Sequence, residues 1–439
     1  MMLHSERLAV VCALLLGACF PKAAPQSPAS APGANPGGPP PIVSVMTAKD
    51  PLHARVNEAV SMIEAGGQVN LTQAVRLLDG LAVEDTSGTA RFNLGVAHRA
   101  LGALDRAASN AQALVAAQPD DGDAWLLLGS VQQQQGAVDA AISTFRAGID
   151  GAPEFMPLRV ALVAALRAQG QSDAAIDESK AALRVNANSL GVYNNFSLAY
   201  LDKGDTTLAR FILQKALQSV EGADNNAYLH TNLGWSFYLD GNVPAATQEL
   251  RRAVELDPGL VPALVYLSRV YMDDRNYGDT VPLLESAAAE APDNADVQLN
   301  LGVAYRGVGR LAEAKTAYER ALALRPAGPD PHFNLGILLG DYEKDYDGAV
   351  AAFNRYIAAG GSDRELAQTH IKAVQKEQDR AARRVKAEAE RKEREEERKR
   401  KEQVLRDAEQ APAPDAPAPA PEESDPPPAE LMPLSPPGQ

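Results

Sequence analysis

Residues 296–326 read "DVQLNLGVAYRGVGRLAEAKTAYERALALRP", and this stretch decides the fold. Leu301 and Tyr305 are four residues apart, so in an α-helix they lie on one face. Gly302 and Ala314 are small, as is required where two helices approach too closely for a larger side chain. Pro326 ends the second helix, because proline cannot continue the helical hydrogen-bond ladder. The stretch therefore predicts a closely packed pair of helices.

The same pattern recurs along the chain. Residues 123–153, "DAWLLLGSVQQQQGAVDAAISTFRAGIDGAP", again place a Leu-Gly pair, a second glycine, an alanine, an aromatic residue and a proline at the same spacings. A period of 34 residues predicts eight copies, with a three-residue insertion before the fifth and one extra residue in the turn of the eighth, around "DYEKDYDGA". We number these copies repeats 1 to 8, and they begin at about residues 88, 122, 156, 190, 227, 261, 295 and 329.

This period and its residue pattern resemble the tetratricopeptide repeat (TPR). The resemblance implies an all-α fold, an α-solenoid of about eight to nine helix pairs, because one pair cannot bury its apolar face without a neighbour. We expect six segments: a lipoprotein signal peptide, a tether with a lipidated cysteine, a degenerate repeat or N-terminal cap, the eight repeats, a capping and charged helix, and an acidic proline-rich disordered tail. Their boundaries are 1–18, 19–50, 51–87, 88–363, 364–410 and 411–439.

The N-terminus predicts export and anchoring. Residues 8–17 form an apolar block of about ten residues, too short to span a bilayer but suited to a secretory signal. The following quartet, Leu16-Gly17-Ala18-Cys19, resembles a bacterial lipobox, which implies cleavage before Cys19 and acylation of that residue. The alternative is a chance cysteine in an ordinary signal peptide. Cys12 and Cys19 are the only cysteines, so no disulfide framework is expected within the fold.

The C-terminal region changes character twice. Leu366, Ile371 and Val374 predict a cap on the last repeat, and after Val385 the apolar stripe ends in "KAEAERKEREEERKRKEQ". This segment has no sustained coiled-coil seam, so we expect a lone helix supported by ion pairs four residues apart. The expected pairs are Glu388/Lys392, Glu390/Arg394, Glu395/Lys399, Glu396/Arg400, Glu397/Lys401 and Glu402/Arg406.

Composition argues for a binding protein and not an enzyme. The histidines are scattered one to a segment, no phosphate-binding glycine loop follows a strand, and no serine stands in a nucleophile-elbow context. We therefore expect no catalytic residues, no metal and no cofactor. The net charge of −15 leaves roughly −14 on residues 51–363, which favours basic or mixed-charge partners and argues against anionic lipid headgroups as a ligand. Nucleic acid is not expected as a partner, because interspersed glutamates nearly neutralise the Lys and Arg residues of the charged helix.

Taken together, the signal, the lipobox and the repeats resemble TPR lipoproteins of the Gram-negative envelope. That class includes pilotins of type IV pilus secretins and myxobacterial gliding-motility lipoproteins. The resemblance implies a scaffold held on the outer membrane by its N-terminal lipid, facing the periplasm, which assembles or maintains an envelope machine, including one for motility. A pilotin-like escort is the alternative, and an accessory to an envelope enzyme is a third reading. The sequence leaves the partner and the oligomeric state open.

The TPR resemblance also implies where a partner binds, because the first helix of each pair lines the concave surface. Position 6 of that helix is asparagine in five of the eight copies. Such a ladder predicts a grip on the backbone of an extended peptide, although asparagine at this position also serves repeat packing. Apolar anchors and arginine donors for carboxylates stand at nearby positions. The predicted groove comprises Asn93, Asn195, Asn232, Asn300, Asn334, Phe92, Tyr228, Trp235, Tyr238, Phe333, Arg99, Arg167, Arg269 and Arg306.

Overall fold

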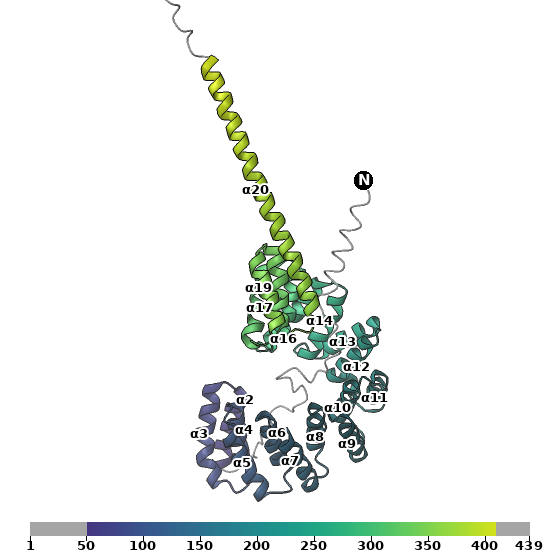
Figure 1. The fold of residues 1–439 in the computed structure, drawn as a ribbon. Coiled ribbons are helices and arrows are strands. Elements are labelled where there is room, and N and C mark those ends of the chain that lie inside the picture. The colour runs from purple at the N-terminus through teal and green to yellow at the C-terminus, as the bar shows by residue number, and fades with distance from the viewer. Residues whose placement is uncertain (1–50, 410–439) are drawn as a thin grey trace, which may run out of the picture. The chain divides into compact units, whose positions relative to one another are not determined.

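A computed structural model describes residues 51–409 of the chain. The expected signal peptide, Cys19, the tether and the tail at 411–439 lie outside these residues. The described part is helical throughout and contains no strand, which confirms the all-α solenoid (Figure 1). Its helices fall into two units, residues 51–374 and residues 375–409.

The first unit consists of helix pairs that follow one another along the chain. The first helices of the pairs are α2 (Pro51–Ala65), α4 (Thr89–Ala100), α6 (Gly122–Gln134), α8 (Met156–Ala168), α10 (Leu190–Asp202), α12 (Ala227–Leu239), α14 (Val261–Asp273), α16 (Ala295–Gly307) and α18 (Asp330–Ile337). The second helices are α3 (Gln68–Glu84), α5 (Leu104–Ala117), α7 (Val138–Gly151), α9 (Ser172–Val185), α11 (Thr206–Ser219), α13 (Val243–Leu256), α15 (Tyr277–Glu290), α17 (Leu311–Leu324) and α19 (Tyr346–Ala358).

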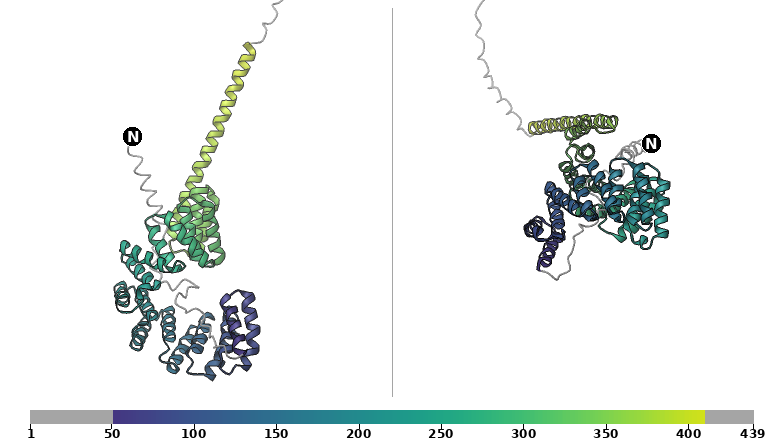
Figure 2. Two further views of the ribbon diagram at one scale, coloured as in Figure 1. Left: turned by 180° about the vertical axis from the view of Figure 1, so that it is seen from behind. Right: turned by 90° about the horizontal axis from the view of Figure 1, so that it is seen from below.

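The contacts between helices give this unit an inside and an outside. Each helix packs on the next one along the chain, and nearly every first helix also packs on the first helix of the next pair. The second helices are not brought together in the same way. The first helices therefore crowd along the inner side of the stack, and the second helices spread along its outer side, as the labels from α3 to α11 show (Figure 1). Figure 2 shows the same ribbon from two further directions.

The two helices of a pair approach each other closely at position 8, where positions are counted from the first residue of each repeat. A Cβ atom added to Gly129 would lie 2.2 Å from Cε1 of Phe145, and one added to Gly302 would lie 2.5 Å from Cε1 of Tyr318. These glycines make room for an aromatic ring at position 24, on the second helix. The sequence pattern thus places its smallest residue where the largest side chain lies, because a larger pair would push the helices apart.

In repeats 3 and 4 the residue at position 24 is not aromatic and the residue at position 8 is larger than glycine. Repeat 4 pairs Ser197 with Leu213 at these two positions, and repeat 3 pairs Val163 with Ser179. All four side chains are buried. The sizes at the two positions are complementary in repeats 2, 3, 4 and 7, whereas repeat 1 combines two small residues, Gly95 and Ala111.

The turn between the helices of a pair contains one residue in the left-handed backbone conformation. Gly309 occupies it in repeat 7 with φ +81°, while Arg275 and Lys344 occupy it in repeats 6 and 8 with φ values of +57° and +60°. A non-glycine residue in this conformation is strained by about 1–2 kcal/mol. Repeats 6 and 8 therefore hold their turns at a cost that repeat 7 does not have.

The extra residue of repeat 8 is not in the turn, where the sequence pattern placed it. Helix α18 continues at Ile337 into a π-helical segment, Leu338–Glu343, which accommodates one more residue in its wider turn. Lys344 then takes the left-handed turn position, one residue later than in the other repeats. The three-residue insertion before repeat 5 coincides with a short 3₁₀-helix, Ala223–Asn225.

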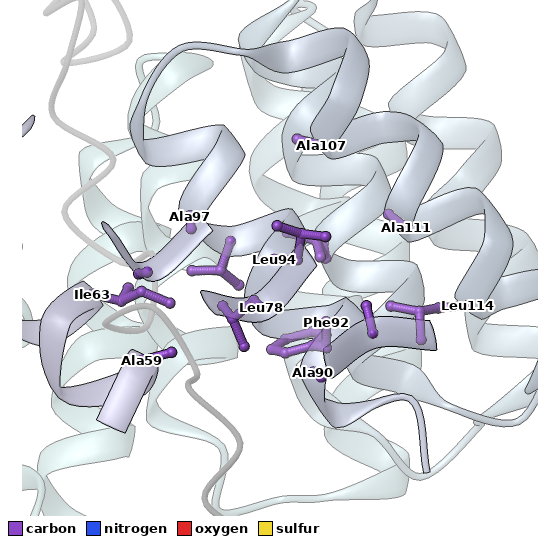
Figure 3. Close-up of a cluster of buried hydrophobic side chains, with 14 of the residues drawn as sticks. Ala59, Ile63, Leu78, Ala90, Phe92, Leu94, Ala97, Ala107, Ala111 and Leu114 are labelled. Atoms are coloured by element: carbon purple, nitrogen blue, oxygen red, sulfur yellow. The ribbon is translucent and has the colours of Figure 1, made fainter. Parts of the chain in front are cut away.

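Residues 51–84 share one hydrophobic core with repeat 1. Figure 3 shows Ile63 of α2 and Leu78 of α3 beside Phe92 and Leu94 of α4. Leu78 is completely buried in this cluster. Helices α2 and α3 therefore cover the apolar face that repeat 1 would otherwise expose.

Helix α20 (Arg364–Glu409) begins as a cap on the last repeat. Ala367 and Val374 are buried in the same cluster as Phe353. His370 stacks on the Phe353 ring with centroids 5.2 Å apart, and burial lowers the pKa of its imidazole. The start of the helix is thus fixed by apolar packing.

The second unit is the remainder of this helix, which is exposed on all sides except at a few positions near its start. Four of the expected ion pairs form, among them Glu388 with Lys392 at 3.1 Å and Glu397 with Lys401 at 2.7 Å. Glu402 pairs with Arg398 at 3.6 Å, not with Arg406 as expected.

The complementary sizes at positions 8 and 24 of repeat 7 predict a double-mutant result. Gly302→Ala should destabilise the solenoid by about 2 kcal/mol, because the added methyl overlaps the Tyr318 ring. The double variant Gly302→Ser, Tyr318→Leu copies repeats 4 and 6. Its loss of unfolding free energy should be much smaller than the sum of the losses in the single variants Gly302→Ser and Tyr318→Leu. Urea unfolding of the wild type, these two single variants and the double variant measures this coupling. Additive free-energy losses would contradict the size complementarity.

Candidate partner-binding surface

The inner surface of the solenoid is built from the first helices, so we located each predicted groove residue on it. Asn93, Asn195, Asn232 and Asn334 are buried, with at most 7% of each residue exposed, while Asn300 is half-buried. Only Asn300 therefore has the exposure that contact with a peptide backbone needs in this conformation.

Three of the four buried asparagines link neighbouring helices. Asn232 donates from Nδ2 to Oδ1 of Asn194 over 2.5 Å, which joins α12 to α10. Asn195 accepts from Arg167 of α8 at 3.4 Å, and Asn334 accepts from Arg306 of α16 at the same distance. These bonds support the packing role for position 6 and leave the peptide ladder a prediction.

Three of the four predicted arginines are bound within the protein. Arg167 forms two hydrogen bonds to the Asp202 carboxylate, at 2.8 and 3.3 Å, with both side chains only 9% exposed. Arg306 is buried and donates to the Tyr318 hydroxyl over 3.3 Å. Arg269 lies 3.2 Å from an Asp273 carboxylate oxygen. Carboxylates thus neutralise Arg167 and Arg269, and neutral acceptors hold Arg306.

Arg99 differs from these three. It is half-buried near the end of α4, and within residues 51–409 no hydrogen bond or ion pair to its guanidinium group occurs. Burial lowers the pKa of Arg99, and no acidic neighbour opposes that shift. A half-buried arginine without a counter-charge is a favourable place for a carboxylate from outside the chain.

The predicted apolar anchors divide into two groups. Phe92 and Phe333 are buried in the core, whereas Tyr228, Trp235 and Tyr238 are half-buried. Trp235 stacks on Tyr238 with ring centroids 4.9 Å apart. The second group therefore gives the inner surface an aromatic region on α12.

Two features of this region were not predicted. Tyr266 of α14 stacks on Trp235 at 4.2 Å, and burial raises the pKa of its hydroxyl. Tyr266 stands at position 6 of repeat 6, so a comparison of that position in all copies would have found it. Asp273 accepts a 2.5 Å hydrogen bond from Tyr238, which repeats the geometry of Arg167 with Asp202: position 12 of one repeat binds position 13 of the next.

The arrangement suits the binding of a partner. It offers stacked aromatic rings, one half-buried cation at Arg99, and carboxylates that are held by internal partners. In the described part of the chain, no three His, Cys, Asp or Glu side chains are grouped so as to hold a metal ion. No helix between residues 51 and 409 is both long enough and apolar enough to cross a bilayer.

Stacked helix pairs with a lined inner surface define the chain as an α-solenoid protein. Two family profiles described as tetratricopeptide repeat match residues 92–154 with 194–261, and residues 271–334, so these parts of the chain consist of tetratricopeptide repeats.

Three known proteins show where similar sequences and folds occur. The type IV pilus assembly protein PilF of Pseudomonas aeruginosa is 25% identical over 39% of this chain and 67% of its own length. A BBSome complex member BBS4 homolog of Drosophila melanogaster is 30% identical over 30% of this chain. The chain spans only 28% of the length of that homolog. Among solved structures, the APC/C hetero-tetramer Cut9-Hcn1 has a TM-score of 0.48 and 16% identity, covering 65% of this chain and 56% of its own.

The buried ion pair between α8 and α10 predicts a large stability effect. Asp202→Ala should destabilise the protein by about 3 kcal/mol, because it leaves Arg167 buried without its counter-charge. Asp173→Ala is the matched control: Asp173 pairs with Lys203, but these side chains are 84% and 43% exposed, so no measurable change is expected. Thermal melts of the two variants make the comparison, and equal effects would refute it.

Proposed function

We propose that the chain is a membrane-anchored TPR scaffold that binds other envelope proteins and helps to assemble or maintain an envelope machine. TPR proteins bind partner proteins or peptides, and this solenoid has an inner surface with accessible aromatic side chains. The observation that carries the proposal is the half-buried, uncompensated Arg99 on the same inner surface as Trp235. A partner segment that presents a carboxylate and an apolar side chain would complement both.

Pilus assembly is the machine that the comparisons favour. PilF is a type IV pilus assembly protein, and its similarity extends over two thirds of its length. This match supports a pilus-related role, including a pilotin-like escort, over the gliding-motility role. An accessory to an envelope enzyme has no observation in its favour.

The acidic charge of the repeats indicates the overall charge of the partner. Residues 51–363 have a net charge of roughly −14, so the field around the inner surface attracts a partner that is basic overall. Such a partner would still carry the one carboxylate that Arg99 receives. Association should therefore slow as salt concentration rises, because screening weakens long-range attraction.

A matched pair of variants tests the binding surface. Arg99→Gln with Trp235→Ala removes the two inner-surface contacts, whereas Arg106→Gln with Trp125→Ala makes the same substitutions away from that surface. Arg106 is exposed on α5, and Trp125 packs against Gly148 of α7. Compared with the wild type, the first variant should capture envelope partners by crosslinking at least about tenfold less. The second variant should capture them at the wild-type level.

The thermal melts of both variants decide whether a loss of capture reflects binding. Equal capture by the two variants would exclude the inner surface as the partner site. The charged helix or the proline-rich tail would then be the better candidate.

Anchoring is tested separately at Cys19, which lies outside the described residues. We expect the wild-type chain to incorporate a clickable fatty acid and to sediment with membranes. Cys19→Ala should abolish both, because the lipid chains hold the protein at the bilayer. An unlabelled wild-type protein would contradict the proposed anchor without affecting the binding surface.

A further inference from the structure

The side chain at position 4 of several repeats binds the connection that leads into the repeat. In four repeats it donates a hydrogen bond to the backbone carbonyl six residues earlier, between the previous helix pair and the first helix of the repeat. The four bonds run from Trp125 to Pro119 at 2.9 Å, from Arg159 to Pro153 at 3.3 Å, from His230 to Asp224 at 3.1 Å and from Gln298 to Pro292 at 3.5 Å. Each bond therefore fastens the connection between two repeats to the helix that follows it.

Two of these side chains also reach the second helix of their own pair. Arg159 lies 2.7 Å from a carboxylate oxygen of Glu178 on α9, and His230 lies 2.7 Å from a carboxylate oxygen of Glu249 on α13. In both repeats the partner stands 19 residues further along the chain. The four side chains are largely buried, with between 9% and 21% of each exposed. His230 therefore has the same role in repeat 5 that Arg159 has in repeat 3.

The two acceptors around His230 require a protonated ring. The Glu249 carboxylate faces Nδ1 and the Asp224 carbonyl oxygen faces Nε2, and neither group can donate. A neutral imidazole has only one N–H, so it would turn a lone pair towards one of these oxygens, whereas an imidazolium donates to both. The hydrogen bond to Glu249 raises the pKa of His230 above its ordinary value of 6.5, although burial and the nearby Arg252 act in the opposite direction.

Three further charged groups lie near His230 on the surface of α13. Arg251, Arg252 and Glu255 line a pocket of about 500 Å³ together with His230 and Glu249. These three side chains are exposed, so the pocket is open to water. The ring can therefore exchange its proton with the solvent without unfolding of the helix pair.

We propose that His230 is a pH-sensitive clasp, which holds the connection between repeats 4 and 5 while it is protonated and releases it when the proton is lost. This connection contains the three-residue insertion, whose 3₁₀-helix Ala223–Asn225 includes Asp224. Arg159 forms the same contacts in repeat 3 but keeps its charge, because a guanidinium group stays protonated in proteins. The clasp is a property of the chain itself and does not depend on the proposed function.

The direction of the pH effect follows from the raised pKa of His230. The clasp stabilises the protein fully below the unfolded-state pKa of about 6.5, and this stabilisation is lost as the pH rises through the folded-state pKa. Burial lowers the pKa of His98, His332 and His370, so their effect on stability has the opposite sign and appears as the pH falls. A global melt therefore mixes the two effects, and the clasp has to be measured locally.

Loss of the clasp should loosen the connection without unfolding α12. The Asn226 side chain caps this helix by accepting from the backbone N–H of Leu229 at 3.1 Å. Ala223 is buried in a large core cluster. Neither contact involves a titratable side chain, so both persist when His230 is neutral. The change is therefore confined to the inserted segment and the first turn of α12, which precede the aromatic region on the same helix.

Hydrogen exchange of the full chain tests the clasp. Between about pH 6 and about pH 9, protection factors in residues 221–233 should fall by about tenfold, which is the effect of losing one charge-assisted hydrogen bond. Protection factors in residues 150–162, the equivalent segment of repeat 3, should stay constant because Arg159 keeps its charge. Protection factors correct for the intrinsic rise of exchange with pH, so equal behaviour of the two segments would overturn the proposal.

Exchanging the two side chains decides whether the pH dependence belongs to position 4. His230→Arg should remove it from repeat 5, and Arg159→His should create it in repeat 3, because the acceptors are equivalent. Glu249→Gln keeps an acceptor for Nδ1 but removes the negative charge, so His230 should titrate at a lower pH by NMR than in the wild type. A pH dependence that survives His230→Arg would overturn the proposal. So would a wild-type His230 that titrates below His332, the histidine at position 4 of repeat 8.

Discussion

The structure depends on how closely the two helices of each pair can approach. At position 8 the backbone of the first helix lies almost against the side chain at position 24, as Gly129 against Phe145 shows. That contact fixes the distance within the pair, and the distance in turn decides how the next pair stacks. The inner surface follows from it, because only tightly joined pairs bring their first helices together.

Polar contacts between successive first helices specify how one repeat lies on the next. The bonds from Arg167 to Asp202 and from Tyr238 to Asp273 join equivalent positions of successive first helices. Buried polar groups tolerate few alternative partners, so these links specify the register of one repeat on the next. Between repeats 6 and 7 the equivalent positions are Met272 and Gly307, and Met272 packs in an apolar cluster with Val303 and Tyr318 instead.

Much of this architecture could be predicted from the sequence, because the repeat period reports helix pairs directly. Gly302 and Tyr318 could be paired by spacing alone. The hydrogen-bond partner of a polar residue could not be predicted, because the Asn195 side chain can accept from a bound peptide as well as from Arg167. The repeat spacing could not predict the π-helix at Leu338–Glu343 either, because one extra residue fits equally in a longer turn or in a widened helix.

The charged part of α20 has a mechanical consequence. As a helix, residues 375–409 extend about 52 Å at 1.5 Å per residue, whereas a flexible chain of that length averages about 33 Å. The helix has almost no apolar packing beyond its start and relies on ion pairs such as Glu388 with Lys392. Ionic strength therefore acts on its length as well as on its stability. The segment is a strut whose reach depends on the electrolyte around it.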